Sequence, residues 1–167
     1  MTEPDTPENL YERFESNAEF QSAVDRLLQC DGRELRIFDP DLVSLRMNSP
    51  QRIELLEEFL TASRIRKLFI SVHDTEHMTG YCPRLMGLLA RYAHAIEVRR
   101  TDESIRHIQD AFLVLDRSHY VRRPVARFFR GALGIHDKSE ALSMYSRYAE
   151  IWAASFPAVS ATTAGLR

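Results

Sequence analysis

The sequence predicts an α/β domain with a single mixed, mostly parallel sheet and helices on both faces. Short segments that are apolar, or alternate between apolar and polar residues, have the length of strands, and segments with apolar residues at helical spacing separate the first three of them. Strands that are connected through helices normally form parallel pairs by right-handed crossovers. The 167 residues, of which 44% are hydrophobic and 28% charged, suffice for one such domain with its own core.

The N-terminal part of the chain predicts a helical segment that precedes this domain. Residues 10–14 predict a short helix, and the capping-box sequence from Ser16 to Glu19 predicts the start of a second helix that ends before Gly32. The chain after Pro157 is rich in small residues. We therefore expect an N-terminal helical segment over residues 1–30, the α/β domain over residues 31–158 and a C-terminal tail over residues 159–167.

Strands and helices alternate through the middle of the chain, and strands alone follow. Ser49 and Pro50 have the residue types of a helix N-cap and first turn, and Pro83 begins another helix. A capping box that starts at Asp137 predicts a final helix, with Leu142 on its core face and Pro157 at its end. Strands are expected at 34–38, 68–72 and 96–99, followed by antiparallel strands at 111–115, 119–122 and 126–130.

His73, Asp74 and His77 follow a predicted strand that is apolar on both faces. The carboxyl ends of parallel strands form the edge at which α/β sheets bind ligands, so these side chains are candidate ligand-binding residues. The two histidines have the spacing of a zinc-protease helix, but the segment leaves a strand and an aspartate stands where the glutamate base would be. We therefore predict no metal site. The alternative interpretation is a polar loop in which Asp74 caps a turn.

Two cysteines and six glycines limit the chemistry expected of the chain. Cys30 and Cys82 lack the paired spacing of a zinc site or a disulfide framework, and Cys82 is expected to be a structural thiol. The sequence has no G-x-S-x-G elbow and no glycine-rich phosphate loop, so no cofactor is predicted. The acidic N-terminus lacks the features of a secretory signal, and no apolar run approaches about 20 residues. These features predict a cytoplasmic protein without membrane contact.

Arginines are concentrated between residues 99 and 130. Guanidinium groups recognise phosphate and carboxylate through paired hydrogen bonds, so this concentration predicts an anion clamp in which Arg122 and Arg123 converge with His73. The arginines on or beside predicted strands are Arg99, Arg100, Arg122, Arg123 and Arg130. The alternative is a solvated sheet edge, where charged residues prevent unwanted strand pairing. The net charge of −2 predicts that nucleic acid is not a partner.

The segment from Gln109 to Asp116 resembles the motif of the phospholipase D superfamily. That motif consists of a histidine, any residue, a lysine, four further residues and an aspartate. Asp116 stands at the aspartate position after an apolar strand, whereas Gln109 replaces the histidine and Ala111 replaces the lysine. The order of the predicted elements also resembles half of that superfamily's fold. The resemblance implies a phospholipase D-like half-domain whose catalytic residues are missing.

The chain from Glu34 to Ala158 also resembles an uncharacterised bacterial domain that occurs alone or behind acetyltransferase domains of the GNAT type. The segments that carry this resemblance are Ile37–Pro40, Val72–Asp74, Asp110–Asp116, Tyr120–Arg123 and Glu150–Trp152. The resemblance implies an acetyltransferase-type partner protein. The presence of one motif copy implies a homodimer, because similar chains with one motif pair two copies.

We expect a non-catalytic binding or regulatory module for a small phosphate-containing anion or a partner protein. The phosphohistidine route is unavailable without an imidazole to attack phosphorus and a lysine to neutralise its oxygens. No residue is therefore assigned a catalytic role, and the candidate ligand-binding residues are His73, Asp74, His77, Asp116, Arg122 and Arg123. The alternative is a hydrolytic enzyme that uses His73, Asp74, His77 and Asp116 at the strand ends.

Overall fold

The computed structural model describes residues 9–160, which form an eight-stranded sheet with helices on both faces. The strands are β1 (Leu10–Phe14), β2 (Glu34–Asp39), β3 (Lys67–Val72), β4 (Ile96–Thr101), β5 (Ala111–Leu115), β6 (His119–Arg123), β7 (Gly131–Ile135) and β8 (Ser155–Val159). The helices are α1 (Asn17–Leu28), α2 (Pro50–Thr61), α3 (Glu76–Tyr81), α4 (Pro83–Arg91) and α5 (Lys138–Ala153), with 3-10 turns η1 (Val43–Leu45) and η2 (Glu103–Ile105).

The sheet has the strand order β1-β7-β6-β5-β2-β3-β4-β8 and is mostly antiparallel. β2 and β3, and likewise β3 and β4, pair in parallel, and each connection runs through helices, α2 in the first and α3 with α4 in the second. All other neighbours run antiparallel. The α/β class and the single mixed sheet are therefore confirmed, whereas the expectation of a mostly parallel sheet is wrong. The antiparallel pairs β2–β5, β5–β6 and β6–β7 already outnumber the two parallel pairs, and the edge strands β1 and β8 add two more antiparallel pairs.

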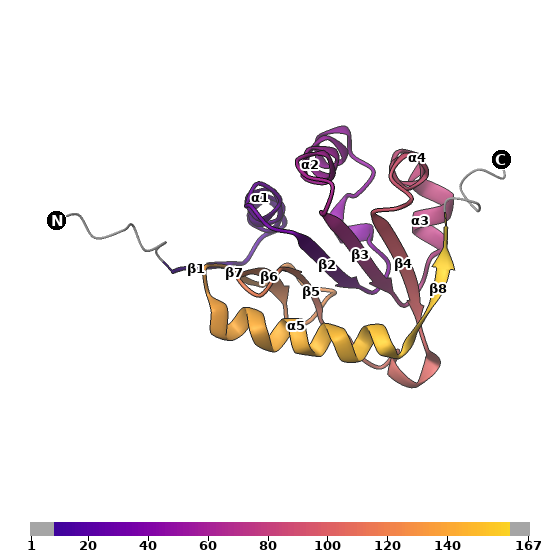
Figure 1. The fold of residues 1–167 in the computed structure, drawn as a ribbon. Coiled ribbons are helices and arrows are strands. Elements are labelled where there is room, and N and C mark those ends of the chain that lie inside the picture. Colours follow the sequence, from indigo (N-terminus) through magenta and orange to yellow (C-terminus); the bar gives the residue numbers. More distant parts are fainter. Residues whose placement is uncertain (1–8, 161–167) are drawn as a thin grey trace.

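Two apolar layers lie on the two faces of the sheet. Figure 1 shows α1 to α4 over one face and α5 running across the other. The larger apolar cluster joins the sheet to α1, α2 and α4 and includes Phe20, Leu56 and Leu88. The smaller cluster lies beneath α5 and includes Phe112 and Tyr148. Side chains of each strand therefore alternate between the two layers.

Residues 1–8 of the expected N-terminal helical segment lie outside the described residues, and the described part is not helical throughout, which differs from the expectation. Residues 10–14 form the edge strand β1, which pairs antiparallel with β7. A segment of five residues is too short to form a stable helix alone, so a distant partner decides its conformation. The N-cap at Ser16 is confirmed: the Glu19 N–H donates to Ser16 Oγ at 3.2 Å, and the Glu19 carboxylate accepts from the Ser16 hydroxyl at 3.0 Å.

The C-terminal segment also differs from expectation in its local details. The strand predicted at 126–130 is wrong, because β7 starts at Gly131. Asp137 does not cap α5 through its side chain, but accepts a hydrogen bond from the Tyr120 hydroxyl at 2.8 Å. Leu142 is 47% exposed and does not contribute to the core.

The last helix ends earlier than the sequence pattern indicates. α5 ends at Ala153, and the chain continues into the edge strand β8, which contains Pro157 and pairs antiparallel with β4. A proline is tolerated there because an edge strand has one side without sheet partners. Residues 161–167 of the predicted tail lie outside the described residues.

We expect acid to destabilise the fold through His119. This ring is 5% exposed, and its Nδ1 accepts the His136 backbone N–H at 2.9 Å. Burial and the neighbouring His136 lower the pKa of His119, although Asp116 opposes the shift. Because the folded protein favours the neutral ring, the free energy of unfolding should decrease as pH falls below about 6.5, the pKa of an unperturbed histidine, until the folded-state pKa is passed. Urea unfolding at pH 8 and pH 5 measures the difference.

His119→Gln is the matched variant, because an amide oxygen can accept the same hydrogen bond without titrating. This variant should show a smaller loss of unfolding free energy between pH 8 and pH 5 than the wild type. An equal loss in both proteins would mean that other groups cause the acid sensitivity.

Candidate anion-binding site

His73 is held by two hydrogen bonds at the carboxyl end of β3. Its Nδ1 lies 2.6 Å from the Thr101 hydroxyl oxygen, and its Nε2 lies 2.7 Å from the Ile108 carbonyl oxygen. A neutral ring satisfies both contacts when Nε2–H donates to the carbonyl and Nδ1 accepts from the hydroxyl. The ring also packs edge-on against Phe38, with 5.3 Å between the centroids. His73 therefore links β3 and β4 to the segment before β5.

Asp74 and His77 have local contacts that do not form a shared site. The Asp74 carboxylate accepts the Glu76 N–H at 2.8 Å, which is the turn-capping geometry expected of a polar loop. His77 lies on α3 and stacks on Tyr81 with 5.9 Å between the ring centroids. Within residues 9–160, no group of three or more histidine, cysteine or acidic side chains has an arrangement that could hold a metal ion.

Asp116 lies at the opposite end of β5 from this edge. Because β5 runs antiparallel to β2, Phe112 pairs with Phe38 near the carboxyl end of β2, whereas Asp116 follows β5 and approaches the start of β2. Its carboxylate accepts the backbone N–H groups of Arg33 and Glu34 at 3.0 and 2.9 Å. Asp116 therefore stabilises a loop connection, and the predicted grouping of Asp116 with His73 does not occur.

Arg123 is buried in an ion pair instead of opening onto a ligand site. Its guanidinium donates to Asp39 at 2.6 Å, and each of the two side chains is 2% exposed. It also donates to the Ala126 carbonyl at 2.6 Å and lies over the Phe20 ring at 4.5 Å. Burial raises the pKa of Asp39 and lowers that of Arg123, and the ion pair opposes both shifts. The predicted convergence of His73, Arg122 and Arg123 is therefore wrong.

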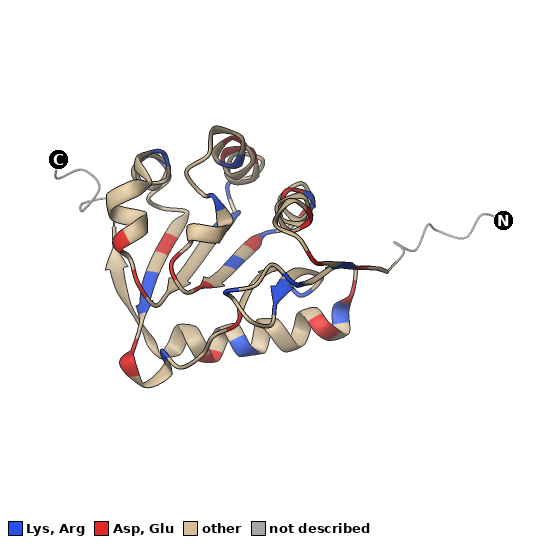
Figure 2. Ribbon diagram, turned by 180° about the vertical axis from the view of Figure 1, so that it is seen from behind, with Lys and Arg blue, Asp and Glu red and all other residues tan. Residues whose placement is uncertain are grey.

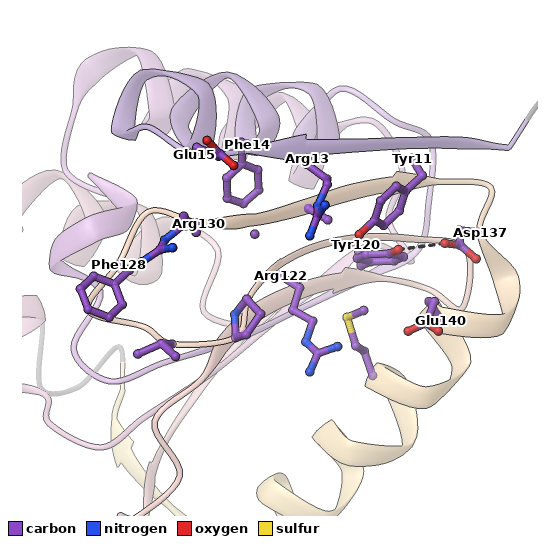
Figure 3. Close-up of a pocket in the computed structure, with 15 residues that line it drawn as sticks. Tyr11, Arg13, Phe14, Glu15, Tyr120, Arg122, Phe128, Arg130, Asp137 and Glu140 are labelled. Carbon is purple, nitrogen blue, oxygen red and sulfur yellow. Dashed lines mark hydrogen bonds between the residues drawn. The ribbon is translucent and has the colours of Figure 1, made fainter.

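Arg122 points to the other face of β6, where α5 lies. Alternation along the strand places Val121 and Arg123 in the larger apolar layer and Tyr120 and Arg122 on the α5 face. Arg122 is exposed and lines a cavity of about 700 Å³ between β1, β6, β7 and the start of α5. Figure 3 shows Arg122 and Arg13 with the aromatic side chains around them.

The floor of this cavity is β7, which lies between β1 and β6 in the sheet. β7 carries small residues on the face toward the cavity. Arg13 of β1 and Arg122 of β6 both pair with Ala132, so the two arginines flank one methyl group from opposite sides. Gly134 is flanked in the same way by Tyr11 and Tyr120. A side chain at Gly134 would collide with the Tyr120 ring, because a Cβ there would lie 2.2 Å from a ring carbon. Ala132 therefore leaves the space of the cavity open, and Gly134 makes room for the Tyr120 ring beside it.

Further charged side chains line the same cavity. Arg130 lies over the Phe128 ring at 5.4 Å, on the loop between β6 and β7. The acidic residues that line the cavity are Glu15, Asp137 and Glu140. No ion pair within the described range 9–160 involves Arg13, Arg122 or Arg130. Acidic and basic segments alternate along α5 (Figure 2), so this helix adds no continuous basic surface beside the arginines.

The sequence indicated Arg122 and Arg130 but missed Arg13 and the aromatic side chains of the cavity. Arg13 was not predicted because its segment was expected to be helical. The small residues at 132 and 134, two positions apart in an apolar strand, were an available signal of open space on one face.

Gln109, at the position of the motif's histidine, lies in a second, shallower depression, whereas Asp116 lies at the other end of β5. Ala111 is 3% exposed and pairs with Arg123, and the Gln109 amide donates to the Arg106 carbonyl at 3.0 Å. The depression is lined by His107, Ile108, Gln109, Asp110, Arg122, Pro124 and Arg147. Arg147 pairs with Asp110 at 2.6 Å. Arg122 lines both the depression and the large cavity, and among residues 9–160 it has no ion pair.

The two cysteines behave as structural thiols. Cys82 is 1% exposed and Cys30 is partly buried, and both are free. Burial raises the pKa of each thiol, so the reactive thiolate form is disfavoured. Neither residue lines the cavity.

Solved structures confirm the phospholipase D-like fold. The chain matches Nuc from Salmonella typhimurium, described as a phospholipase D family member, with 14% identity, a TM-score of 0.60 and coverage of 92% of this chain and 100% of that one. It matches NucT from Helicobacter pylori with 15% identity, a TM-score of 0.59 and coverage of 90% and 100%. At these identities the likeness shows the fold alone.

A third solved structure corrects one expectation about partners. TrmBL2, an archaeal chromatin protein whose structure is described as showing a novel mode of DNA binding, matches with 12% identity and a TM-score of 0.64. The match covers 93% of this chain and 56% of that one. The exclusion of nucleic acid from net charge alone is therefore wrong, because the same fold occurs in a protein described as binding DNA.

Other comparisons concern membrane contact and the family. No helix between residues 9 and 160 is long and apolar enough to cross a membrane. The cytoplasmic location, the homodimer and the association with acetyltransferases stay predictions.

No curated protein matches the chain. A family model described as "Domain of unknown function (DUF7931)" matches residues 16–161, and the chain therefore belongs to that family.

Proposed function

We propose that this protein is a non-catalytic binding module that holds a phosphate-containing anion in the cavity between β1, β6, β7 and α5. The observation that carries the proposal is the pair Arg13 and Arg122, which flank Ala132 from opposite sides. Adjacent strands are about 4.8 Å apart, so the backbones of the two arginines are separated by roughly 10 Å. Both side chains are long enough to direct their guanidinium groups to one anion above Ala132.

The electrostatic environment supports this assignment. Arg13, Arg122 and Arg130 are exposed and have no ion pair with any acidic side chain of residues 9–160. A guanidinium group without an internal partner keeps its donors available, and its planar geometry suits two parallel hydrogen bonds to phosphate.

The non-catalytic part of the proposal depends on Gln109 and Ala111. Gln109 has no basic nitrogen to attack phosphorus, and the methyl group of Ala111 is buried at the start of β5. His73 does not replace the missing imidazole, because both of its ring nitrogens are already hydrogen-bonded. Hydrolysis of a generic phosphodiester that disappears in His73→Gln would contradict a non-catalytic role and favour the hydrolytic alternative.

Titration with inorganic phosphate tests the binding site. We expect Arg13→Ala and Arg122→Ala each to weaken phosphate binding by about 1.5–3 kcal/mol, the contribution of a charge-assisted hydrogen bond. Isothermal titration calorimetry measures the affinities. Arg91→Ala is the control, because Arg91 is an exposed arginine on α4, across the sheet from the cavity, and should bind phosphate as the wild type does.

Arg147→Ala distinguishes the large cavity from the shallow depression. If phosphate occupies the cavity, Arg13→Ala weakens binding and Arg147→Ala leaves it unchanged. The reverse pattern places the anion in the depression and rules out the proposed site. A wild-type protein that does not bind phosphate contradicts the proposal altogether.

A further inference from the structure

Tyr11 presents an unused aromatic face beside the proposed phosphate position. It is 59% exposed, lines the cavity, and makes no ring contact with any residue of the described range 9–160. Tyr11 and Arg13 lie on the same face of β1, two residues apart, which separates their backbones by about 7 Å. A ligand bound to Arg13 by its phosphate can therefore place a neighbouring ring against Tyr11. Exposed aromatic faces of this kind commonly stack on flat ligands.

Acidic side chains lie at the same end of the cavity as Tyr11. Figure 3 shows Asp137 and Glu140, from the start of α5, near Tyr11 and Tyr120. Burial and the hydrogen bond to Asp137 raise the pKa of Tyr120, so Tyr120 stays a neutral donor to that carboxylate. Glu140 is exposed and makes no ion pair among the described residues. Carboxylates here repel a second phosphate and accept hydrogen bonds from hydroxyl groups.

The charges of the cavity limit how many phosphate groups a ligand can carry. The guanidinium groups of Arg13, Arg122 and Arg130 are balanced by the carboxylates of Glu15, Asp137 and Glu140. A single phosphate beside the arginines satisfies them, whereas a chain of phosphates would extend toward the carboxylates. The volume of about 700 Å³ lies within the usual range for sites that bind small organic molecules.

We infer that the ligand is a nucleoside monophosphate, with its phosphate between Arg13 and Arg122, its base against Tyr11 and its sugar hydroxyls near Glu140. This inference rests on the proposed function and adds the chemical class of the ligand. Three surfaces of different chemistry line one cavity, and a nucleoside monophosphate carries the three matching groups. The base recognition is by stacking, so it does not distinguish one base from another.

Calorimetric titration with four compounds tests the ligand class: adenosine 5′-monophosphate, ribose 5-phosphate, inorganic phosphate and adenosine. We expect adenosine monophosphate to bind about tenfold more tightly than ribose 5-phosphate, the effect of one stacking contact. Tyr11→Ala should remove this difference and leave the affinity for inorganic phosphate unchanged. Tyr11→Phe, which keeps the aromatic face, should retain it. Tyr81→Ala is the control, because Tyr81 is 73% exposed on α3, far from the cavity lining.

The outcomes separate this inference from the proposed function. One outcome is that phosphate binding depends on Arg13 and Arg122 while adenosine monophosphate and ribose 5-phosphate bind with equal affinity. This result contradicts the nucleotide as the ligand and supports the anion site. If adenosine binds as tightly as adenosine monophosphate, the phosphate group contributes nothing to binding. This result contradicts both the nucleotide inference and the proposed phosphate site. If a 5′-phosphorylated oligonucleotide binds more tightly than adenosine monophosphate, the ligand is the end of a nucleic-acid strand. This result contradicts the inference of a free nucleotide.

Discussion

Replacing Arg123 by alanine is expected to lower the free energy of unfolding by about 3–5 kcal/mol, because the substitution leaves the buried carboxylate of Asp39 without its cation. Asp39 is 1% exposed and would keep, among residues 9–160, the backbone N–H groups of Asp41 and Leu42 as its donors. The substitution also removes the guanidinium from the Phe20 ring. Urea unfolding followed by circular dichroism measures the change.

Arg122→Ala is the matched control for this prediction. Arg122 is the preceding residue, has the same chemistry and faces the cavity, so its removal should change stability by no more than about 0.5 kcal/mol. In Asp39→Asn/Arg123→Ala, the amide avoids an unpaired buried charge, and this double variant should be more stable than Arg123→Ala alone. Equal stabilities for Arg122→Ala and Arg123→Ala would show that the ion pair does not support the fold.

Gly131→Ala is expected to destabilise the fold by about 3 kcal/mol, because a Cβ at this position has no space. It would lie 1.8 Å from the Arg122 carbonyl oxygen and 2.7 Å from the Phe14 ring. The first of these contacts is with the backbone, so β6 and β7 must move apart to accommodate the methyl group. Chemical denaturation measures the change in stability. Weaker phosphate binding is also expected, because Arg13 and Arg122 flank Ala132, the residue next to Gly131, and a phosphate titration measures this effect.

Gly80→Ala is the control for this substitution. Gly80 lies in α3, and a Cβ there meets no atom within 4 Å. Alanine favours a helix over glycine by up to about 1 kcal/mol, so this variant should be as stable as the wild type or more stable. If Gly131→Ala is equally well tolerated, the strands are not as close as the structure shows.

The elements that sequence analysis located correctly are those with a strong local pattern. The apolar runs of β2, β3 and β5 and the capping signals of α1 and α2 depend on residues within a few positions of one another. Local interactions are sufficient to specify such segments. β1 lacked such a pattern, because its three central residues are all exposed, and the segment acquires its conformation only when β7 pairs with it.

The site was predicted less well, because it depends on which strands become neighbours. His73 and Arg123 were selected as ligand-binding residues, but hydrogen bonds and an ion pair to residues distant in sequence occupy both. Arg122 was also selected, and it cannot share a site with Arg123, because consecutive residues of a strand point to opposite faces of the sheet. Alternation alone does not determine which of the two faces is open.

The sequence by itself determined the α/β class, the parallel unit of β2, β3 and β4, and the loss of the phospholipase D-type histidine and lysine at Gln109 and Ala111. These features depend on residue identity and short-range periodicity. Only the tertiary structure decided that β1 lies next to β7, which brings Arg13 opposite Arg122 although these residues are far apart along the chain. The pairing of distant strands depends on burial of the whole sheet, and no local pattern encodes it.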